Sequence, residues 1–162
     1  MKRLILMCHA ETLLSGYDPG PQTPLSPDGT RAATVAGQFL AAYAIDLVLV
    51  APTTYAVQTW EAACLGGVWA AKVELIDWLS DPLGRQLEPL VLSLPDKIST
   101  VLLIGREPGL HSLAFGLLRP FQSAFDELPP ASIFVMQHER EWYNMPGAAK
   151  KETYKYIEAP RR

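Results

Sequence analysis

The sequence predicts an α/β fold, a three-layer sandwich with a mostly parallel central sheet. Three short, continuously apolar runs predict buried strands at residues 4–7, 47–50 and 101–104. Continuous rather than alternating hydrophobicity is typical of parallel strands that are covered on both faces. Helical patterns separate these runs, and strands that alternate with helices favour a parallel sheet between two helical layers.

Three helices are expected between and after these strands. The first begins after Ser26, with a proline and an aspartate in its first turn, and reaches about residue 43. The second runs from about residue 54 to 65, contains Cys64 as an expected core residue, and closes at two glycines. The third follows the third apolar run, where apolar side chains recur at helical spacing at Leu110, Leu113, Ala114, Leu117 and Leu118.

The remaining elements are less regular. We expect a short strand at residues 73–76, a helix near residues 82–94, and two late strands at 133–137 and 141–145. A tight turn between the late strands would leave His138 in solvent.

A single domain is expected over residues 1–162. Within it, residues 150–162 carry five basic and two acidic side chains and are expected to form a basic, partly frayed tail. A docking contact for an acidic partner is the alternative for this tail.

Composition excludes several classes of protein. With 49% hydrophobic and 19% charged residues, the chain is not intrinsically disordered, and a net charge of −3 gives no basic field that would attract nucleic acid. No apolar stretch reaches the roughly 18 residues that span a bilayer, and His9 and Glu11 interrupt the apolar start too early for a signal peptide. We expect a cytoplasmic protein with no membrane or nucleic-acid partner and with no cofactor. The oligomeric state stays open.

Polar residues follow each of the three apolar runs. The first run ends at Cys8 and His9, the second leads to Thr53 and Thr54, and the third leads to Arg106. The carboxyl ends of parallel strands share one edge of a sheet, and ligands bind there where the strand order reverses. A histidine, two hydroxyls and an arginine are therefore expected to converge at this edge, where a helix N-terminus after Thr53 would favour an anion.

Three segments resemble the motifs of the histidine phosphatase superfamily. The segment "LILMCHA" at 4–10 resembles the strand and "RHG" signature that open the family, and "APTTYAVQTWE" at 51–61 is similar to "SPxxRAxQTxE". The segment "VLLIGREPGL" at 101–110 resembles the strand that ends in "GHxPGL". The short chain, the "PPASI" segment around Ser132 and the closing "EWYNMPG" resemble the compact SixA-type phosphohistidine phosphatases in particular. The resemblance implies a phosphoglycerate mutase-like fold.

The resemblance also implies phosphoryl transfer through a histidine. In this family the histidine of the first motif attacks phosphorus and becomes transiently phosphorylated, while two arginines and a second histidine hold the phosphoryl oxygens. Cationic donors are needed because negative charge spreads over these oxygens in the transition state. His9 occupies the position of the nucleophile and is the candidate catalytic residue.

The chain departs from the family pattern at three of these four positions. Cys8 replaces the arginine before the nucleophile, Tyr55 replaces the second arginine, and Arg106 replaces the second histidine. The candidate phosphate-binding residues are therefore Arg106, Thr53 and Thr54. Because one lost transition-state donor costs about two to three decades of rate, we expect a pseudophosphatase that binds a phosphorylated ligand or protein, with weak or no turnover.

Two alternatives remain open for the function. In one, His9 still transfers phosphate slowly through a phosphoenzyme, with Arg106 as the phosphate clamp. In the other, the chain is a protein-interaction module with no phosphate site. Different small-ligand chemistry on the same fold is a further reading, since a fold does not fix a function.

Cys8 invites two other hypotheses, which the sequence disfavours. A cysteine phosphatase needs an arginine in the pattern "CxxxxxR", and the chain has Leu14 at that position. A zinc site is disfavoured because Cys8 and His9 are adjacent on a strand and should point to opposite faces. We therefore expect Cys8 to be a small packed residue and expect no metal.

Overall fold

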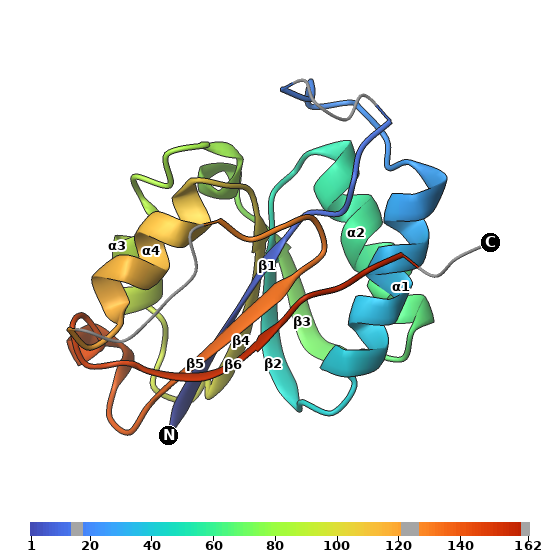
Figure 1. Ribbon diagram of the computed structural model, residues 1–162. Coiled ribbons are helices and arrows are strands. Elements are labelled where there is room, and N and C mark those ends of the chain that lie inside the picture. The colour runs from blue at the N-terminus through green and yellow to red at the C-terminus, as the bar shows by residue number, and fades with distance from the viewer. Residues whose placement is uncertain (14–17, 121–126, 160–162) are drawn as a thin grey trace.

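The computed structural model describes residues 1–13, 18–120 and 127–159 and shows three layers around one sheet (Figure 1). Helices α1 (Pro27–Leu40) and α2 (Thr54–Leu65) cover one face of the sheet. Helices α3 (Leu87–Leu92) and α4 (Gly109–Leu117) cover the other. The predicted three-layer α/β sandwich is confirmed.

The sheet has six strands in the order β3-β2-β4-β1-β5-β6. Four of them run parallel to one another: β1 (Lys2–Cys8), β2 (Ile45–Val50), β3 (Ala70–Leu75) and β4 (Thr100–Gly105). Strand β5 (Ile133–His138) is antiparallel to β1, and β6 (Lys150–Lys155) is antiparallel to β5. The chain places β4 between β2 and β1, so the strand order reverses beside β1, where a ligand site is expected.

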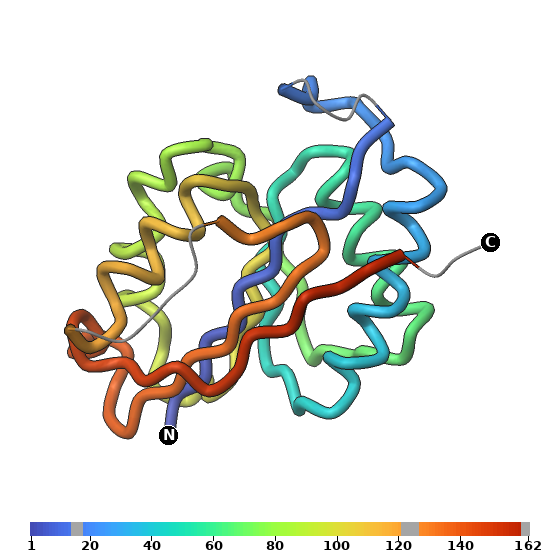
Figure 2. Tube along the Cα trace, in the orientation of Figure 1, coloured from blue at the N-terminus to red at the C-terminus, as the bar shows by residue number. Residues whose placement is uncertain are grey.

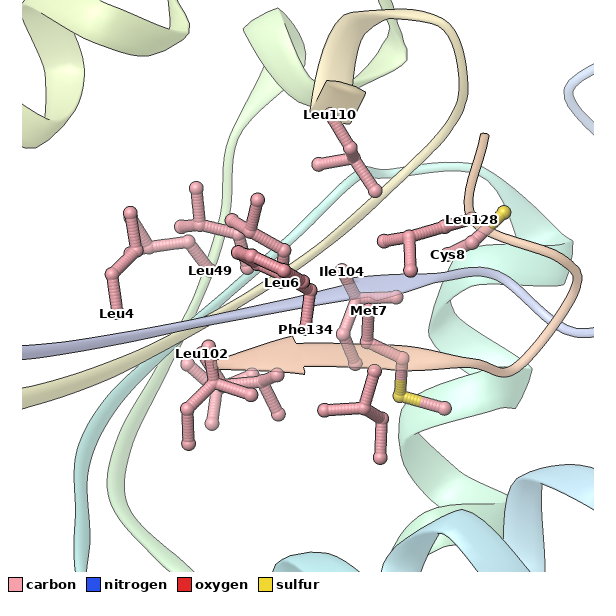
Figure 3. Close-up of a cluster of buried hydrophobic side chains, with 14 of the residues drawn as sticks. Leu4, Leu6, Met7, Cys8, Leu49, Leu102, Ile104, Leu110, Leu128 and Phe134 are labelled. Atoms are coloured by element: carbon pink, nitrogen blue, oxygen red, sulfur yellow. The ribbon is translucent and has the colours of Figure 1, made fainter. Parts of the chain in front are cut away.

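The three apolar runs form the centre of the core, as their hydrophobicity predicts. Strands β1, β2 and β4 are almost completely buried because helices cover them on both faces. Figure 3 shows the side chains alternating between the faces: Cys8 lies with Leu110 and Leu128 on the face of α4, and Met7 points to the opposite face.

Helices α1 and α2 approach each other closely through glycine. A Cβ atom on Gly37 would lie 1.8 Å from the carbonyl oxygen of Ala63, and one on Gly66 would lie 2.1 Å from that of Thr34. Both distances are too short for any side chain, so glycine is required at this contact. The contact fixes the position of α2, whose first turn carries Tyr55.

The predicted starts of α1 and α2 agree with the structure. The Ser26 hydroxyl accepts a hydrogen bond from Gly29 N–H at 2.9 Å, and the Thr53 hydroxyl caps α2 in the same way. The segment at 82–94 is helical only over α3, and a short 3-10 helix, η1 (Asp77–Ser80), precedes it.

The prediction of a strand at residues 141–145 was wrong. This segment forms a 3-10 helix, η2 (Trp142–Asn144), because Trp142 is fully buried and its indole N–H donates to the Ile98 carbonyl at 2.8 Å.

The last strand, β6, lies in the segment that was expected to be a frayed tail. An ion pair between Arg3 and Glu152 at 2.8 Å joins it to the rest of the fold, and Ile157, just beyond it, is buried. Charged side chains are common on an edge strand, so the basic composition of residues 150–155 does not exclude one. Residues 160–162 of the predicted tail lie outside the described residues.

Two single-residue expectations were also wrong. His138 is buried, with 7% of its surface exposed, and its ring bonds to the side chain of Asn144. Cys64, expected in the core, is exposed at the end of α2. No helix in the described part of the chain is long and apolar enough to cross a membrane.

Candidate functional site

The ends of the three central strands lie side by side at one edge of the sheet, the upper edge in Figure 2. Cys8 is in register with Gly105, and Val50 is in register with Ile104. The backbone N–H of His9 donates to the carbonyl of Gly105 at 3.0 Å. The segments that carry the three motifs therefore begin at neighbouring points on this edge.

His9 presents a neutral imidazole with one nitrogen available. Its Nδ1–H donates to the carbonyl of Ala10 at 2.8 Å, which leaves the lone pair on Nε2. Burial, and then the charge of Arg106, lower the pKa of His9, while the bond to Ala10 opposes this shift. A neutral ring with a free lone pair is the form that a nucleophilic histidine requires.

Tyr55 lies against this imidazole. The two ring centroids are 4.3 Å apart with the planes tilted by 55°, and Tyr55 is buried. The Thr59 hydroxyl links the backbone of the two segments that carry these rings. It accepts a hydrogen bond from Ala10 N–H at 3.0 Å and donates one to the Tyr55 carbonyl at 2.7 Å. Sequence reasoning did not single out Thr59, although it is the threonine of the "QTWE" segment.

Arg106 brings positive charge to His9. It is the one cation, among the residues that the structure describes, whose charge shifts the pKa of this histidine. The guanidinium forms an ion pair with Asp18, and its buried Nε has no hydrogen-bond partner among the described residues. Sequence reasoning missed Asp18 because 88 residues separate the two side chains along the chain. Asp18 offsets part of the charge that an anion would meet.

The two candidate threonines lie at the start of α2, directly after the end of β2. Thr53 is buried, and its hydroxyl oxygen accepts from Ala56 N–H at 3.4 Å. The Thr54 N–H donates to the Pro21 carbonyl at 2.8 Å. Two of the first amide groups of the helix are thus engaged within the protein. These two amides are therefore not available to hold an anion.

Cys8 is a buried, neutral thiol. Burial, followed by the charge of Glu107, raises the pKa of Cys8 to about 12. Its sulfur lies beside Leu128 on the face of the sheet that α4 covers (Figure 3). The position that would hold an arginine in the family pattern therefore carries no positive charge.

Glu107 is a half-buried carboxyl group next to Arg106 in the sequence, and the ion-pair partner of Arg106 in the structure is Asp18 instead. Burial, and then the charge of Glu127, raise the pKa of Glu107 to about 7, although it accepts a hydrogen bond from His111 N–H at 3.2 Å. This carboxyl group therefore titrates near neutral pH. When ionised it adds negative charge at this edge and so opposes the binding of an anion.

The described residues hold no cluster of three or more His, Cys, Asp or Glu side chains that could bind a metal ion. The structure brings the Tyr55 ring and the charge of Arg106 to the His9 imidazole, and it places the Thr53 and Thr54 hydroxyls at the nearby start of α2. Such a set can bind a single oxyanion and can present Nε2 of His9 to it.

No family model matches the sequence, and no curated protein matches it. Among solved structures, a candidate phosphohistidine phosphatase SixA from Nakamurella multipartitia superposes with a TM-score of 0.81 at 29% identity, over 96% of both chains. A protein histidine phosphatase SixA complexed with tungstate gives a TM-score of 0.75 at 20% identity, over 97% of this chain and 96% of that one. A SixA candidate from Agrobacterium tumefaciens gives 0.73 at 16% identity, over 96% and 98%. At 20% and 16% identity, the likeness concerns the fold alone.

Proposed function

The chain has the fold of the histidine phosphatase superfamily in its SixA-type form, and from this premise we propose that it binds a phosphorylated ligand or protein with weak or no turnover. One observation carries the proposal: a buried neutral thiol, Cys8, and a buried tyrosine, Tyr55, occupy the two positions where the family pattern has arginines. The fold that presents the histidine is kept, while the charge that would stabilise the transition state is reduced.

The missing charge has a large expected effect on the rate. A transferring phosphoryl group spreads negative charge over its oxygens, and fixed cationic donors lower the barrier by meeting that charge. Each lost donor typically costs about two to three decades of rate, so two independent losses would cost about four to six decades. The loss of the two arginines weakens the binding of a ground-state phosphate less than it slows the reaction. A bound phosphate needs fewer donors at fixed positions than the transition state does.

Arg106 supports the binding half of the proposal. Its ion-pair partner Asp18 has a side chain that is 77% exposed, and exposed ion pairs contribute little free energy. A phosphate can therefore replace Asp18 at small cost, and the Nε of Arg106, which has no hydrogen-bond partner in the described part of the chain, can donate to it. The hydroxyls of Thr53 and Thr54 are the neutral donors in the proposed site.

A slow phosphatase is the second candidate, and the state of His9 favours it. In that reaction, Nε2 of His9 attacks phosphorus, the bond from phosphorus to the leaving group breaks, and its electron pair departs with the leaving group. Water then attacks phosphorus, the bond from phosphorus to Nε2 breaks, and inorganic phosphate leaves, which regenerates the free ring. The bond from Nδ1 to Ala10 holds the ring in the tautomer that this step requires.

Binding is tested by titration with inorganic phosphate, followed through the ¹⁵N resonances of the histidine rings. We expect a saturable shift of Nε2 of His9 in the wild type, lost in Arg106→Ala. Arg85→Ala is the matched control, because Arg85 is also in an ion pair with an aspartate but lies on an exposed loop. Its titration should equal that of the wild type. An unchanged His9 resonance at all concentrations would favour the interaction module.

Turnover is tested with a phosphohistidine-bearing peptide and with His9→Ala as the reference. The proposal expects a wild-type rate close to that of the variant. A fast wild-type rate that is sustained over many turnovers and disappears in His9→Ala would instead establish the phosphatase and overturn the assignment as a pseudoenzyme.

A further inference from the structure

A cavity of about 370 Å³ lies at the opposite edge of the sheet from His9. One of its lining residues, His138, pairs with Lys2 at the beginning of β1, whereas His9 follows the end of that strand. A strand of this length spans about 20 Å, so the cavity is separate from the candidate site. Its walls carry three cationic side chains, Arg119, Arg140 and Lys150.

Arg119 and Arg140 differ from the other described arginines in their ion pairing. Each of the other four is in an ion pair: Arg3 with Glu152, Arg31 with Asp28, Arg85 with Asp81, and Arg106 with Asp18. Neither Arg119 nor Arg140 forms an ion pair with a described carboxylate, and the same holds for Lys150. Among the described residues that line the cavity, one is acidic, Glu139, so these residues together carry an excess of positive charge.

Two of the donors at the cavity are held in place by the protein. The Nε–H of Arg119 donates to the Ala148 carbonyl at 3.2 Å, which leaves the two terminal nitrogens of the guanidinium for another partner. The buried ring of His138 holds the side-chain oxygen of Asn144 at 2.7 Å. The Asn144 amide nitrogen has a long contact with Glu141, 3.5 Å, and keeps a second hydrogen to donate.

We propose that this cavity binds a small organic phosphate. Two guanidinium groups match the geometry of phosphate oxygens, and the ammonium of Lys150 adds a mobile point charge. The amide groups of Gln137 and Asn144 supply the neutral donors that would fix the orientation of the ligand. The cavity volume lies in the range of small-molecule sites. This inference does not depend on whether the His9 site binds or turns over phosphate.

Titration with AMP tests the proposal, followed through the side-chain amide resonances of Gln137 and Asn144. We expect saturable shifts with a Kd of about 1 mM or lower at physiological salt. The double variant Arg119→Gln/Arg140→Gln should weaken binding at least about tenfold, because charge-assisted bonds to the phosphate are lost. Arg106→Ala should leave these shifts unchanged.

The matched control is Arg31→Gln/Arg85→Gln, which removes two positive charges elsewhere on the surface. Equal weakening in this control would show that only net charge matters and would overturn the proposal. No saturable shift up to about 10 mM AMP would also overturn it. A phosphoserine peptide that binds more tightly than AMP would overturn the assignment to a small molecule in favour of a phosphorylated protein.

Discussion

The rings of His9 and Tyr55 lie in contact, with their centroids 4.3 Å apart. The family pattern has an arginine at the position of Tyr55, so this chain has a buried aromatic side chain beside the histidine in place of a phosphate clamp. A tyrosine in place of the arginine keeps the site well packed but removes a positive charge. The loss of charge is therefore compatible with a stable fold.

Restoring the family residues should raise phosphatase activity. In the triple variant Cys8→Arg/Tyr55→Arg/Arg106→His, two cationic donors return to the site, and each can contribute about two to three decades of rate. Hydrolysis of a phosphohistidine peptide measures the gain. The same variant with His9→Ala should show none.

A folded triple variant with no gain would contradict the assignment of these positions to the site. Circular dichroism and thermal unfolding distinguish this result from a variant that fails to fold. Arginine at position 8 would enter a buried environment next to Glu107, and their opposite charges would offset part of the cost of burial.

The two cysteines should differ strongly in reactivity. Cys8 is buried and its pKa is raised to about 12, whereas Cys64 is exposed. Since the thiolate is the reactive form, iodoacetamide at pH 8 should modify one thiol per native chain. Mass spectrometry should locate the label on Cys64. Rapid labelling of the native Cys64→Ser variant would show that Cys8 is accessible. This result would contradict the burial of Cys8 in the structure.

Glu107 should make the protein less stable as the pH rises. Its pKa is raised from an ordinary value of 4.5 to about 7, so the folded state holds a proton that the unfolded state has released within this window. The contribution is fully present below about pH 4.5 and is lost as the pH approaches 7. Urea unfolding of Glu107→Gln at pH 5 and pH 7 should show a smaller fall in the free energy of unfolding than the wild type shows. Equal falls would mean that Glu107 is not the group responsible.

Gly37→Ala should destabilise the fold by pushing α1 away from α2. The added Cβ would meet the Ala63 carbonyl at 1.8 Å, and overpacking of this kind costs about 1–3 kcal/mol or more. Urea unfolding measures the loss. Gly20→Ala is the matched control because its Cβ would meet only the Thr23 hydroxyl at 3.8 Å. A free energy of unfolding equal to that of the wild type in Gly37→Ala would contradict the close contact.

The central strands could be predicted from the sequence because the apolar residues within each segment indicate that the segment is buried. A run such as 101–104 is apolar at every position, and a strand that is covered on both faces buries every side chain of such a run. The C-terminal part could not be predicted in this way. Trp142 is buried through a contact with Ile98, and Lys150–Lys155 becomes a strand because β5 offers it an edge. Both facts depend on partners far away in the sequence.

The candidate site also combines features that the local sequence predicts with features that depend on distant contacts. Motif positions are local, so the sequence indicates His9 and Arg106 as the residues to consider, and the structure places Arg106 where its charge acts on His9. The ion pair with Asp18 and the raised pKa of Glu107 arise only when separate segments pack together. These two carboxylates reduce the positive charge at the site, and neither the pairing of Asp18 with Arg106 nor the raised pKa of Glu107 follows from a local pattern.

A crystal structure of the chain with tungstate, an oxyanion of the charge and shape of phosphate, tests the central claim most directly. The account predicts an anion next to Nε2 of His9, with the Arg106 side chain turned from Asp18 to contact it. A structure at saturating tungstate in which Arg106 keeps Asp18 and no anion lies beside His9 would contradict it.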